Sequence, residues 1–281
     1  MKKQNVLITG CSTGIGFSAA TLLHQRGYNV VATVRNDQDR QSLAQLDITT
    51  TLLDLNDSDS INHAFAFALK HFDNRLDALF NNAAFGQAGA IEDLSREVLR
   101  QQFETNVFGT QELTNLAIKQ MRQQGHGRII YNSSVLGIIS MAYRGAYNAS
   151  KYALEGLADT LRQEVAGSHI YISLIEPGPI ISQFRATAFS KYKQNINKEN
   201  SVHRDTYEAM ERRLQKQGPA APFTLPPEAV VDKLIHALES QRPKIRYYVT
   251  FPTYLFATLK RLLPHRLLDW VLMKVSQGEN K

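Results

Sequence analysis

Short apolar runs rich in β-branched residues recur along the chain, and most stretches between them carry apolar residues at helical spacing. The runs that we predict as strands are Asn5–Thr9, Asn29–Val34, Thr50–Asp54, Leu76–Asn81, Arg128–Asn132, Ile170–Ile175 and Ile245–Val249. The predicted helices are Ile15–Arg26, Asp57–His71, Ser95–Arg122, Ala146–Val165 and Pro227–Ser240. Several strands are largely apolar, as in a parallel sheet that helices cover on both faces. The pattern therefore predicts an α/β fold, with a doubly wound parallel sheet in a single domain over residues 1–281.

A long interval at about residues 179–226 breaks this alternation. We predict an insertion there, near the strand ends at which such folds bind ligands. Its large apolar side chains either pack among themselves or form the walls or lid of an apolar substrate pocket, and we expect the pocket to include some of them. They are Phe184, Phe189, Tyr192, Tyr207 and Met210.

The C-terminal tail, at about residues 241–281, is basic and amphipathic. Six Lys or Arg residues and no Asp or Glu lie between Ser240 and Leu268, and Leu255, Leu259 and Leu262 fall on one helical face. The uncharged run from Tyr247 to Leu259 contains Pro252 and is too short to span a bilayer. Two interpretations remain open: a helix that caps the parent fold or a neighbouring subunit, or a peripheral contact with an anionic membrane.

Composition excludes several classes of protein. The chain has 281 residues, 43% of them hydrophobic and 21% charged, as expected of a folded protein with a sizeable core. Its one cysteine, Cys11, excludes an intramolecular disulfide framework and fits a reducing, cytoplasmic compartment. The net charge of +6 would attract an anionic cofactor, membrane or nucleic acid, but no nucleic-acid module is recognisable. No His-Glu-x-x-His or Cys-x-x-Cys spacing occurs, so neither a metal site nor nucleic-acid binding is predicted.

A glycine-rich turn, Thr9-Gly-Cys-Ser-Thr-Gly-Ile-Gly16, joins the first predicted strand to the first predicted helix. In that context glycines let the backbone approach a pyrophosphate, whose charge then meets the helix N-terminus. A glycine turn without a ligand is the alternative. The residues that we expect to contact such a cofactor are Gly10, Ser12, Thr13, Gly14, Ile15 and Gly16.

A tyrosine and a lysine stand one helical turn apart, at Tyr147 and Lys151. A phenol ordinarily loses its proton near pH 10, so tyrosine works as a base near neutral pH only when a cation stabilises its anion. Residues four apart on a helix share a face, which places the ammonium of Lys151 beside the ring of Tyr147. The spacing alone is common in helices, and its significance depends on the glycine turn upstream.

Together, the Thr-Gly-x-x-x-Gly-Ile-Gly turn and the later Tyr-x-x-x-Lys resemble the short-chain dehydrogenase/reductase family. The likeness extends from Val6 to about Ala237 and implies a Rossmann-like fold and hydride transfer with a nicotinamide cofactor. Within the family, segments Tyr147–Gly156 and Leu174–Ile180 are similar to bacterial NADP-dependent aldehyde reductases and to retinol and 17β-hydroxysteroid dehydrogenases. That likeness implies an aldehyde or ketone of a fairly apolar compound as the substrate.

The resemblance also implies four catalytic roles. Tyr147 is the general acid in reduction and the base in oxidation, and Lys151 lowers its pKa and holds the nicotinamide ribose. Ser134 hydrogen-bonds the substrate oxygen, with Ser133 the weaker candidate. Asn106 kinks its helix and holds a water that links Lys151 to solvent. Each residue also has an ordinary alternative as packing, a solvated charge, a turn residue or a cap.

Further cofactor contacts follow from the same resemblance. Asn81–Ala84 matches a segment on the adenosine side of the cofactor, with Ala84 where glycine is usual. Asp54 matches an aspartate that contacts adenine, although a turn carboxylate is the alternative. Glu176-Pro-Gly-Pro179 matches a turn beside the nicotinamide, which its prolines stiffen. The additional cofactor residues implied are Asp54, Leu55, Asn82, Ala83, Pro177, Gly178 and Ile180.

The choice between the two nicotinamide cofactors depends on the end of the second strand. NAD-dependent relatives carry an acid there that binds both ribose hydroxyls, whereas this chain has Val34 followed by Arg35. A guanidinium suits a phosphate, so we predict NADP(H) in preference to NAD(H), with Thr13 and Asn36 as helpers, although Asp37 lies nearby.

Two other classes of function stay open. One is a catalytically silent NADP-binding sensor or scaffold, although such proteins usually lack the tyrosine or lysine. The other is the extended branch of the family that acts on nucleotide sugars, whose glycine spacing and C-terminal domain differ. Relatives commonly pair through the helices predicted here at Ser95–Arg122 and Ala146–Val165, so we expect a homodimer or homotetramer.

Overall fold

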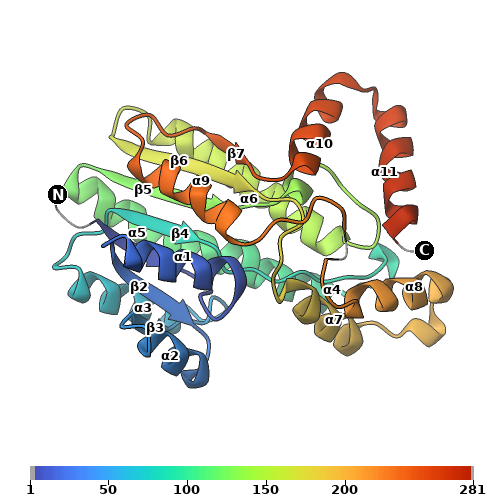
Figure 1. Ribbon diagram of the computed structural model, residues 1–281, viewed down its shortest axis with the longest axis horizontal. Coiled ribbons are helices and arrows are strands. Elements are labelled where there is room, and N and C mark those ends of the chain that lie inside the picture. The colour runs from blue at the N-terminus through green and yellow to red at the C-terminus, as the bar shows by residue number, and fades with distance from the viewer. Residues whose placement is uncertain (1–3, 220, 280–281) are drawn as a thin grey trace.

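The computed structural model describes residues 4–219 and 221–279. In this part of the chain seven parallel strands form one sheet, in the order β3-β2-β1-β4-β5-β6-β7 (Figure 1). The strands are β1 Asn5–Ile8, β2 Asn29–Val34, β3 Thr49–Leu52, β4 Ala78–Asn81, β5 Gly127–Asn132, β6 Ile170–Glu176 and β7 Arg246–Tyr248. The predicted α/β fold with a doubly wound parallel sheet is therefore confirmed.

Helices cover both faces of the sheet. The helices of the described residues are α1 Gly14–Gln25, α2 Asp37–Ala44, α3 Ser58–His71, α4 Arg96–Phe103, α5 Thr110–Gln124, α6 Gly145–Glu164, α7 Phe184–Asn195, α8 Arg204–Gln215, α9 Glu228–Glu239, α10 Phe251–Leu262 and α11 His265–Glu279. Side chains of α3, α5 and α6 form a core on one face, and those of α1, α2 and α9 form a core on the other.

The first strand shows why its residues are apolar throughout. Because successive side chains of a strand point to opposite faces, Leu7 enters one core while Val6 and Ile8 enter the other. The strand order reverses between β1 and β4, since β1 pairs with β2 on one side and β4 on the other. In open α/β sheets the crevice beyond the carboxyl ends of such strands is where ligands bind.

One predicted helical segment differs from the observed one, and one observed helix was not predicted. The helix expected at Ser95–Arg122 is α4 and α5 joined by a π-helical segment, Glu104–Gly109, which contains Asn106. Helix α2 was not predicted, because its sequence is polar and only Leu43 of the helix is buried. Its start is capped by Asn36, whose side chain accepts a hydrogen bond from the Asp39 amide at 2.8 Å.

The insertion at 179–226 folds into α7 and α8, linked by a 3₁₀ turn at Lys198–Asn200. Of the five large apolar side chains expected to include pocket walls, Tyr192, Tyr207 and Met210 form the core of the insertion and do not line the cavity described below. These side chains sit on the inner faces of α7 and α8, where helical spacing alone cannot distinguish packing from ligand contact. Phe184 and Phe189 do line the cavity.

The C-terminal segment returns to the sheet as β7 and then forms a hairpin of α10 and α11, which stands apart from the sheet in Figure 1. One side of the hairpin packs on the body of the protein. Phe256, Leu268 and Leu272 are buried in a cluster with Leu136 and Met141. Leu259 packs against this cluster, whereas Leu255 and Leu262 are exposed, so the three leucines do not share one buried face. Among the described residues no helix is long and apolar enough to cross a membrane.

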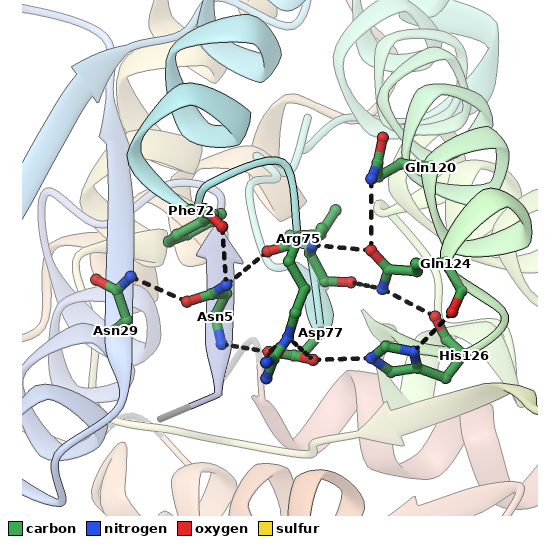
Figure 2. A network of polar contacts seen from close by, with 9 residues as sticks. Asn5, Asn29, Phe72, Arg75, Asp77, Gln120, Gln124 and His126 are labelled. Atoms are coloured by element: carbon green, nitrogen blue, oxygen red, sulfur yellow. Dashed lines mark hydrogen bonds and ion pairs between the residues drawn. The ribbon is translucent and has the colours of Figure 1, made fainter. Parts of the chain in front are cut away.

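A polar network ties the strands together at their amino ends, opposite the ligand crevice (Figure 2). Asp77 lies at its centre: its carboxylate accepts hydrogen bonds from the Asn5 amide at 2.8 Å and from Arg75, and its Oδ1 lies 3.0 Å from Nε2 of His126. The Asn5 side chain in turn accepts a hydrogen bond from Asn29 at 2.9 Å. The network thereby joins the starts of β1, β2, β4 and β5.

Candidate active site at the carboxyl ends of the strands

A cavity of about 990 Å³ opens beyond the carboxyl ends of the central strands and extends under α7 and α8. It is lined by most of the residues predicted to bind cofactor or act in catalysis. Those that line it are Gly10, Ser12, Thr13, Gly14, Ile15, Arg35, Asp54, Leu55, Asn82, Ala83, Ser134, Tyr147, Lys151, Pro177, Gly178 and Ile180. Gly16 and Asn106 do not line it.

The glycine turn gives the cavity an anion-binding end. Gly10 and Gly14 have φ angles of +70° and +58°, which L side chains rarely adopt. The helix that begins at Gly14 has no acidic residue in its first turn, and the Thr13 side chain does not cap it. Its first backbone amides are therefore left for another partner, as a pyrophosphate site requires.

Gly16 has a packing role rather than a lining one. A Cβ at this position would stand 2.1 Å from the Gly10 carbonyl oxygen and 2.6 Å from the Asn82 side-chain nitrogen. Glycine is therefore required for α1 to approach the turn closely. Asn82 holds the turn in place by donating from its side chain to the Thr9 carbonyl at 2.9 Å.

The cysteine of the turn is inert. Cys11 is fully buried, and burial raises the pKa of its thiol to about 12. Its Sγ donates to the carbonyl of Ile8 at 3.3 Å. Cys11 is therefore a small packing residue beneath the turn, since a reactive cysteine needs a depressed pKa and exposure.

Arg35, the residue expected to discriminate between NADP(H) and NAD(H), is exposed and lines the cavity. Among the described residues Arg35 forms neither a hydrogen bond nor an ion pair, and Val34 before it is buried. Asp37 lies 3.0 Å from Arg40 in an ion pair. Asn36 caps α2, so its side chain is engaged elsewhere. The guanidinium of Arg35 is thus free to donate hydrogen bonds to a phosphate, whereas the side chain of Asn36 would contribute little.

Asp54 is a cavity residue and a turn residue at once. Its Oδ1 accepts hydrogen bonds from the backbone and side-chain nitrogens of Asn56, both at 2.9 Å. Among the described residues no hydrogen bond to its other carboxylate oxygen is present. The carboxylate is thus held by the turn with one oxygen left for a ligand.

Tyr147, Lys151 and Ser134 meet at the reactive end of the cavity, and all three are buried. Burial raises the pKa of Tyr147 to about 12, and the Ser134 hydroxyl opposes this by hydrogen bonding to the phenolate. Burial also lowers the pKa of Lys151 to about 8, with the charge of Glu155 opposing. Desolvation is therefore the dominant influence on the pKa of Tyr147, and the group that opposes it is Ser134 and not Lys151 as expected.

The ammonium of Lys151 is placed by the strand beside it. Its Nζ lies 5.6 Å from the centroid of the Tyr147 ring and donates to the Asn132 carbonyl at 2.7 Å. Because α6 carries both residues on one face, the helix fixes their separation. Ser134, at the end of β5, completes the group from a different element.

Asn106 acts from behind the cavity. It lies in the π-helical segment, and its side chain donates to the Phe85 carbonyl at 3.0 Å and to the Ser150 hydroxyl at 3.0 Å. Ser150 donates in turn to the Tyr147 carbonyl at 2.8 Å. Asn106 therefore fixes α6 against the strand end at the level of the tyrosine and lysine. π-Helical segments often occur at functional sites for such reasons.

The Pro177–Gly178 turn also lines the cavity. The Pro177 carbonyl accepts a hydrogen bond from the Val135 amide at 2.8 Å, which ties it to the serine segment. A Cβ on Gly178 would stand 2.1 Å from Oγ1 of Thr250, so glycine lets the start of α10 pack directly behind the turn.

Residues 4–193 match the short chain dehydrogenase family. The chain belongs to that family. The uncharacterized oxidoreductase YbbO of Escherichia coli strain K12 is 43% identical over 270 residues, which cover 96% of this chain and 94% of that protein. Retinol dehydrogenase 8 of Homo sapiens is 30% identical over 272 residues, which cover 92% of this chain and 85% of that protein. The expected likeness to retinol dehydrogenases is thus confirmed.

Solved short-chain dehydrogenases share the whole fold. A short-chain dehydrogenase from Streptomyces avermitilis has a TM-score of 0.75 and 26% identity, with 99% of both chains covered. Another, from Burkholderia phymatum, is in complex with NAD and has a TM-score of 0.78 at 22% identity, with 95% of each chain covered. A serine dehydrogenase complexed with NADP⁺ has a TM-score of 0.75 at 22% identity and covers 88% of this chain and 95% of that one. The fold is therefore found with either cofactor.

Two residues at the reactive end of this short-chain dehydrogenase were not singled out from the sequence as partners. The Phe184 ring lies 5.1 Å from the Tyr147 ring, at an angle of 59° between their planes. A Cβ on Gly86 would stand 2.6 Å from Cζ of Phe184. Gly86 follows the Asn81–Ala84 segment closely, and its role depends on a contact with an insertion far along the chain, which sequence spacing does not reveal.

A buried acidic group behind the site was also missed. Arg246 of β7 binds Glu176 at 3.1 Å and Glu155 at 3.0 Å, and burial raises the pKa of Glu176 to about 9. Burial also raises the pKa of Glu155, and the Ser133 hydroxyl and Arg246 oppose this shift, so Ser133 faces this group and Ser134 faces Tyr147. In the described part of the chain no group of three or more His, Cys, Asp or Glu residues could hold a metal ion.

Proposed function

We propose that this short-chain dehydrogenase is an NADP(H)-dependent oxidoreductase that interconverts a carbonyl and an alcohol on a fairly apolar substrate. The observation that carries the proposal is the meeting of Tyr147, Lys151 and Ser134 in one buried wall of a cavity whose other end is the glycine turn. A dinucleotide that spans the cavity would have its pyrophosphate at α1 and its reactive ring at the tyrosine.

The proposed chemistry assigns proton transfer to the protein. The bound nicotinamide would supply or accept the hydride. Because the pKa of Tyr147 is raised to about 12, its hydroxyl stays protonated near neutral pH and can protonate the carbonyl oxygen of a substrate during reduction. Ser134 would donate a hydrogen bond to the same oxygen. Lys151 would stabilise the phenolate that remains, and Asn106 would keep α6 in register through Ser150.

Preference for NADP(H) is proposed from the charge at the end of β2. Arg35 is an exposed fork of donors beside the cavity, and Val34 in the preceding position cannot repel a 2′-phosphate. Thr13 lines the same end of the cavity and would assist. The cofactor-bearing neighbours favour neither cofactor, because one holds NAD and another NADP.

An apolar substrate is proposed from the walls near Tyr147. Leu136, Met141, Phe184, Ala188 and Phe189 line the cavity there. Such a surface binds hydrocarbon by removing it from water and offers few partners to a polar body. The 30% identity to a retinol dehydrogenase supports a retinoid, steroid, or aliphatic or aromatic aldehyde as the class.

We further propose a homodimer or homotetramer that forms through α4, α5 and α6, in a reducing compartment such as the cytoplasm. Large apolar side chains are exposed on α6 and on the π-helical segment between α4 and α5. They are Phe108, Tyr152 and Leu157. Exposed apolar groups on long helices are typical of subunit interfaces.

The decisive experiment is a panel of aliphatic and aromatic aldehydes, retinoids and steroids with NADPH, followed by loss of absorbance of the reduced cofactor. We expect turnover of apolar carbonyl compounds. If the protein binds NADPH but turns over none of them, the proposal is wrong and a silent NADP sensor or scaffold takes its place.

A further inference from the structure

We propose that the outer face of the α10–α11 hairpin docks this protein on an anionic lipid surface. The outer face is defined as the exposed side chains of the hairpin that point away from its buried cluster. Its apolar members are Phe251, Tyr254, Leu255, Leu262, Leu267, Trp270 and Met273, and its unpaired basic members are Arg261, Arg266 and Lys274. This proposal concerns a partner and stands apart from the proposed reaction.

The exposure of these side chains is the first argument. Leu262 is 73% exposed and Trp270 is 55% exposed, although both lie in regular helices. The hairpin already has an apolar inner side, with Phe256, Leu268 and Leu272 buried against the body. Apart from Phe251 and Tyr254, whose rings contact Phe223 and Tyr248, the outer apolar side chains are therefore additional to what packing requires. A patch of this kind marks an interaction site.

Spacing on the helices is the second argument. On α10, Leu255 and Leu262 are seven residues apart and so lie on one side, two turns from each other. On α11, Trp270 lies four residues after Arg266 and four before Lys274, so the indole stands between two cations on one side. Alternation of basic and apolar side chains on a helix surface is typical of helices that lie in a membrane interface. Trp and Tyr prefer that layer.

The charge of the outer face favours a lipid surface over a second copy of the chain as its partner. Among the hairpin residues whose side chains are described, the one acidic residue is Asp269. Within the described residues Arg261, Arg266 and Lys274 form no ion pair. A two-fold dimer through this face would bring two copies of the same basic surface together, and their charges would repel. An anionic lipid layer neutralises them instead, and the net charge of +6 adds to the attraction.

Lys260 does not belong to the docking face, because it attaches the hairpin to the body. Its Nζ donates to the Ile138 carbonyl, lies 3.1 Å from the Tyr152 hydroxyl and stands over the Tyr152 ring at 4.6 Å. The hairpin is therefore held from the inside while its outer face remains available.

The position of the hairpin suggests how docking would serve catalysis, an argument that rests on the proposed function. The buried cluster beneath the hairpin includes Tyr147, and Phe184 packs against it. A membrane on the outer face would thus lie one helix layer from the catalytic tyrosine. An apolar carbonyl compound dissolved in lipid could reach the cavity without crossing much water.

The chain contains a built-in probe for docking. Trp270 is its one tryptophan, so the fluorescence of the whole protein reports this residue. The full-length protein is mixed, without cofactor or substrate, with vesicles of phosphatidylcholine alone or of phosphatidylcholine with phosphatidylglycerol. We expect a blue shift of the emission and co-flotation with the anionic vesicles, both reversed by high salt.

Two sets of variants test the two parts of the face. Arg261→Gln with Arg266→Gln and Lys274→Gln removes the charges, and Leu262→Ser with Met273→Ser removes apolar contact. Each set should weaken vesicle binding at least about tenfold. One matched control removes the same charge by Lys70→Gln, Lys119→Gln and Arg122→Gln, at exposed positions on α3 and α5. The other makes the same apolar-to-polar change by Leu46→Ser, in the turn after α2, with Phe67→Ser on α3, both at exposed positions. The controls should bind vesicles as the native protein does.

The proposal fails if Trp270 emission and flotation do not respond to anionic vesicles, or if the control variants lose binding as much as the hairpin variants. It also fails if sedimentation shows that the hairpin variants dissociate an oligomer, because the face would then be an interface between copies. Reduction of a water-soluble aldehyde should be unchanged in the hairpin variants. Since vesicle binding is measured without substrate, failure of the proposed reaction leaves this test intact.

Discussion

At the scale of single residues, the site depends on burial more than on paired charges. Tyr147 and Lys151 share a helix face as the sequence indicates, yet desolvation raises the pKa of one and lowers that of the other. Near neutral pH the phenol of Tyr147 therefore stays protonated, whereas Lys151, with a pKa of about 8, remains mostly charged. A protonated phenol beside an ammonium is the arrangement that the proposed carbonyl reduction requires.

The first prediction concerns the phenol itself. Tyr147→Phe keeps the ring and its contact with Phe184 but removes the proton donor. We expect kcat for carbonyl reduction to fall about 10²–10⁴-fold, which is the usual contribution of a general acid. NADPH affinity, measured by fluorescence titration, should change little. Native-like turnover in this variant would refute the role of Tyr147.

A second prediction concerns cofactor choice at Arg35. Arg35→Ser should raise the KM for NADPH about 10–100-fold, as expected for loss of charge-assisted hydrogen bonds, and leave the KM for NADH nearly unchanged. Steady-state kinetics with both cofactors measure this. Arg40→Ser on α2 is the matched control, because Arg40 is already paired with Asp37. Equal losses with the two cofactors in Arg35→Ser would contradict phosphate recognition.

At the scale of elements, the insertion and the C-terminal hairpin complete a site that the central sheet begins. The strand ends carry the glycine turn, Ser134 and the Pro177 turn, whereas α7 adds Phe184 and α10 supports Gly178. These late elements determine what approaches Tyr147. Their contacts join segments distant in sequence, which is why motif spacing located the catalytic group but not its surroundings.

The third prediction tests the contact between the loop after β4 and the start of α7. Gly86→Ala would place a Cβ only 2.6 Å from Cζ of Phe184, which is too close, so the ring must move. Overpacking of this kind should lower the free energy of unfolding by about 1–3 kcal/mol and reduce kcat/KM for an apolar aldehyde.

The double variant Gly86→Ala with Phe184→Leu provides the check, because the smaller side chain makes room for the methyl group. Denaturation and kinetics together should show that it recovers much of both losses, as coupled neighbours do. If the two substitutions act additively, Gly86 and Phe184 do not constrain each other.

At the scale of the whole molecule, the sequence predicted the sheet and most of the residues that the structure brings together around the cavity, but not the outlying layers. Apolar strands such as β1 are unambiguous, since both faces are buried. Helix α2 escaped prediction because it buries a single leucine, and its cap by Asn36 is a polar contact that periodicity does not detect. The sequence could not separate Tyr192 and Tyr207, which pack, from Phe184 and Phe189, which line the cavity, because packing and ligand contact leave the same pattern of aromatic residues.

The fourth prediction concerns global stability and the network in Figure 2. Burial alone would raise the pKa of Asp77, but hydrogen bonds from Arg75, Asn5 and His126 outweigh it and lower that pKa below its ordinary value. A carboxylate with a depressed pKa stabilises the fold above the pKa of the unfolded chain, about 4, and this stability is lost as the pH falls through the folded pKa.

Asp77→Asn should therefore lower the free energy of unfolding near pH 7 by about 1–3 kcal/mol and flatten its fall below about pH 4. Urea denaturation at a series of pH values measures both effects. Asp232→Asn, at an exposed position on α9, is the control and should leave the profile unchanged. A profile for Asp77→Asn with the native acid slope would mean that the network does not set this dependence.

The burial of Cys11 has a practical consequence. The thiol lies under the glycine turn, fully shielded, and no other cysteine exists in the chain. A cysteine introduced on the surface would therefore react alone with maleimides or spin labels, with no need first to remove a native one. Distances between subunits, or the depth of a chosen residue in a bilayer, become measurable by resonance spectroscopy on an otherwise unaltered protein.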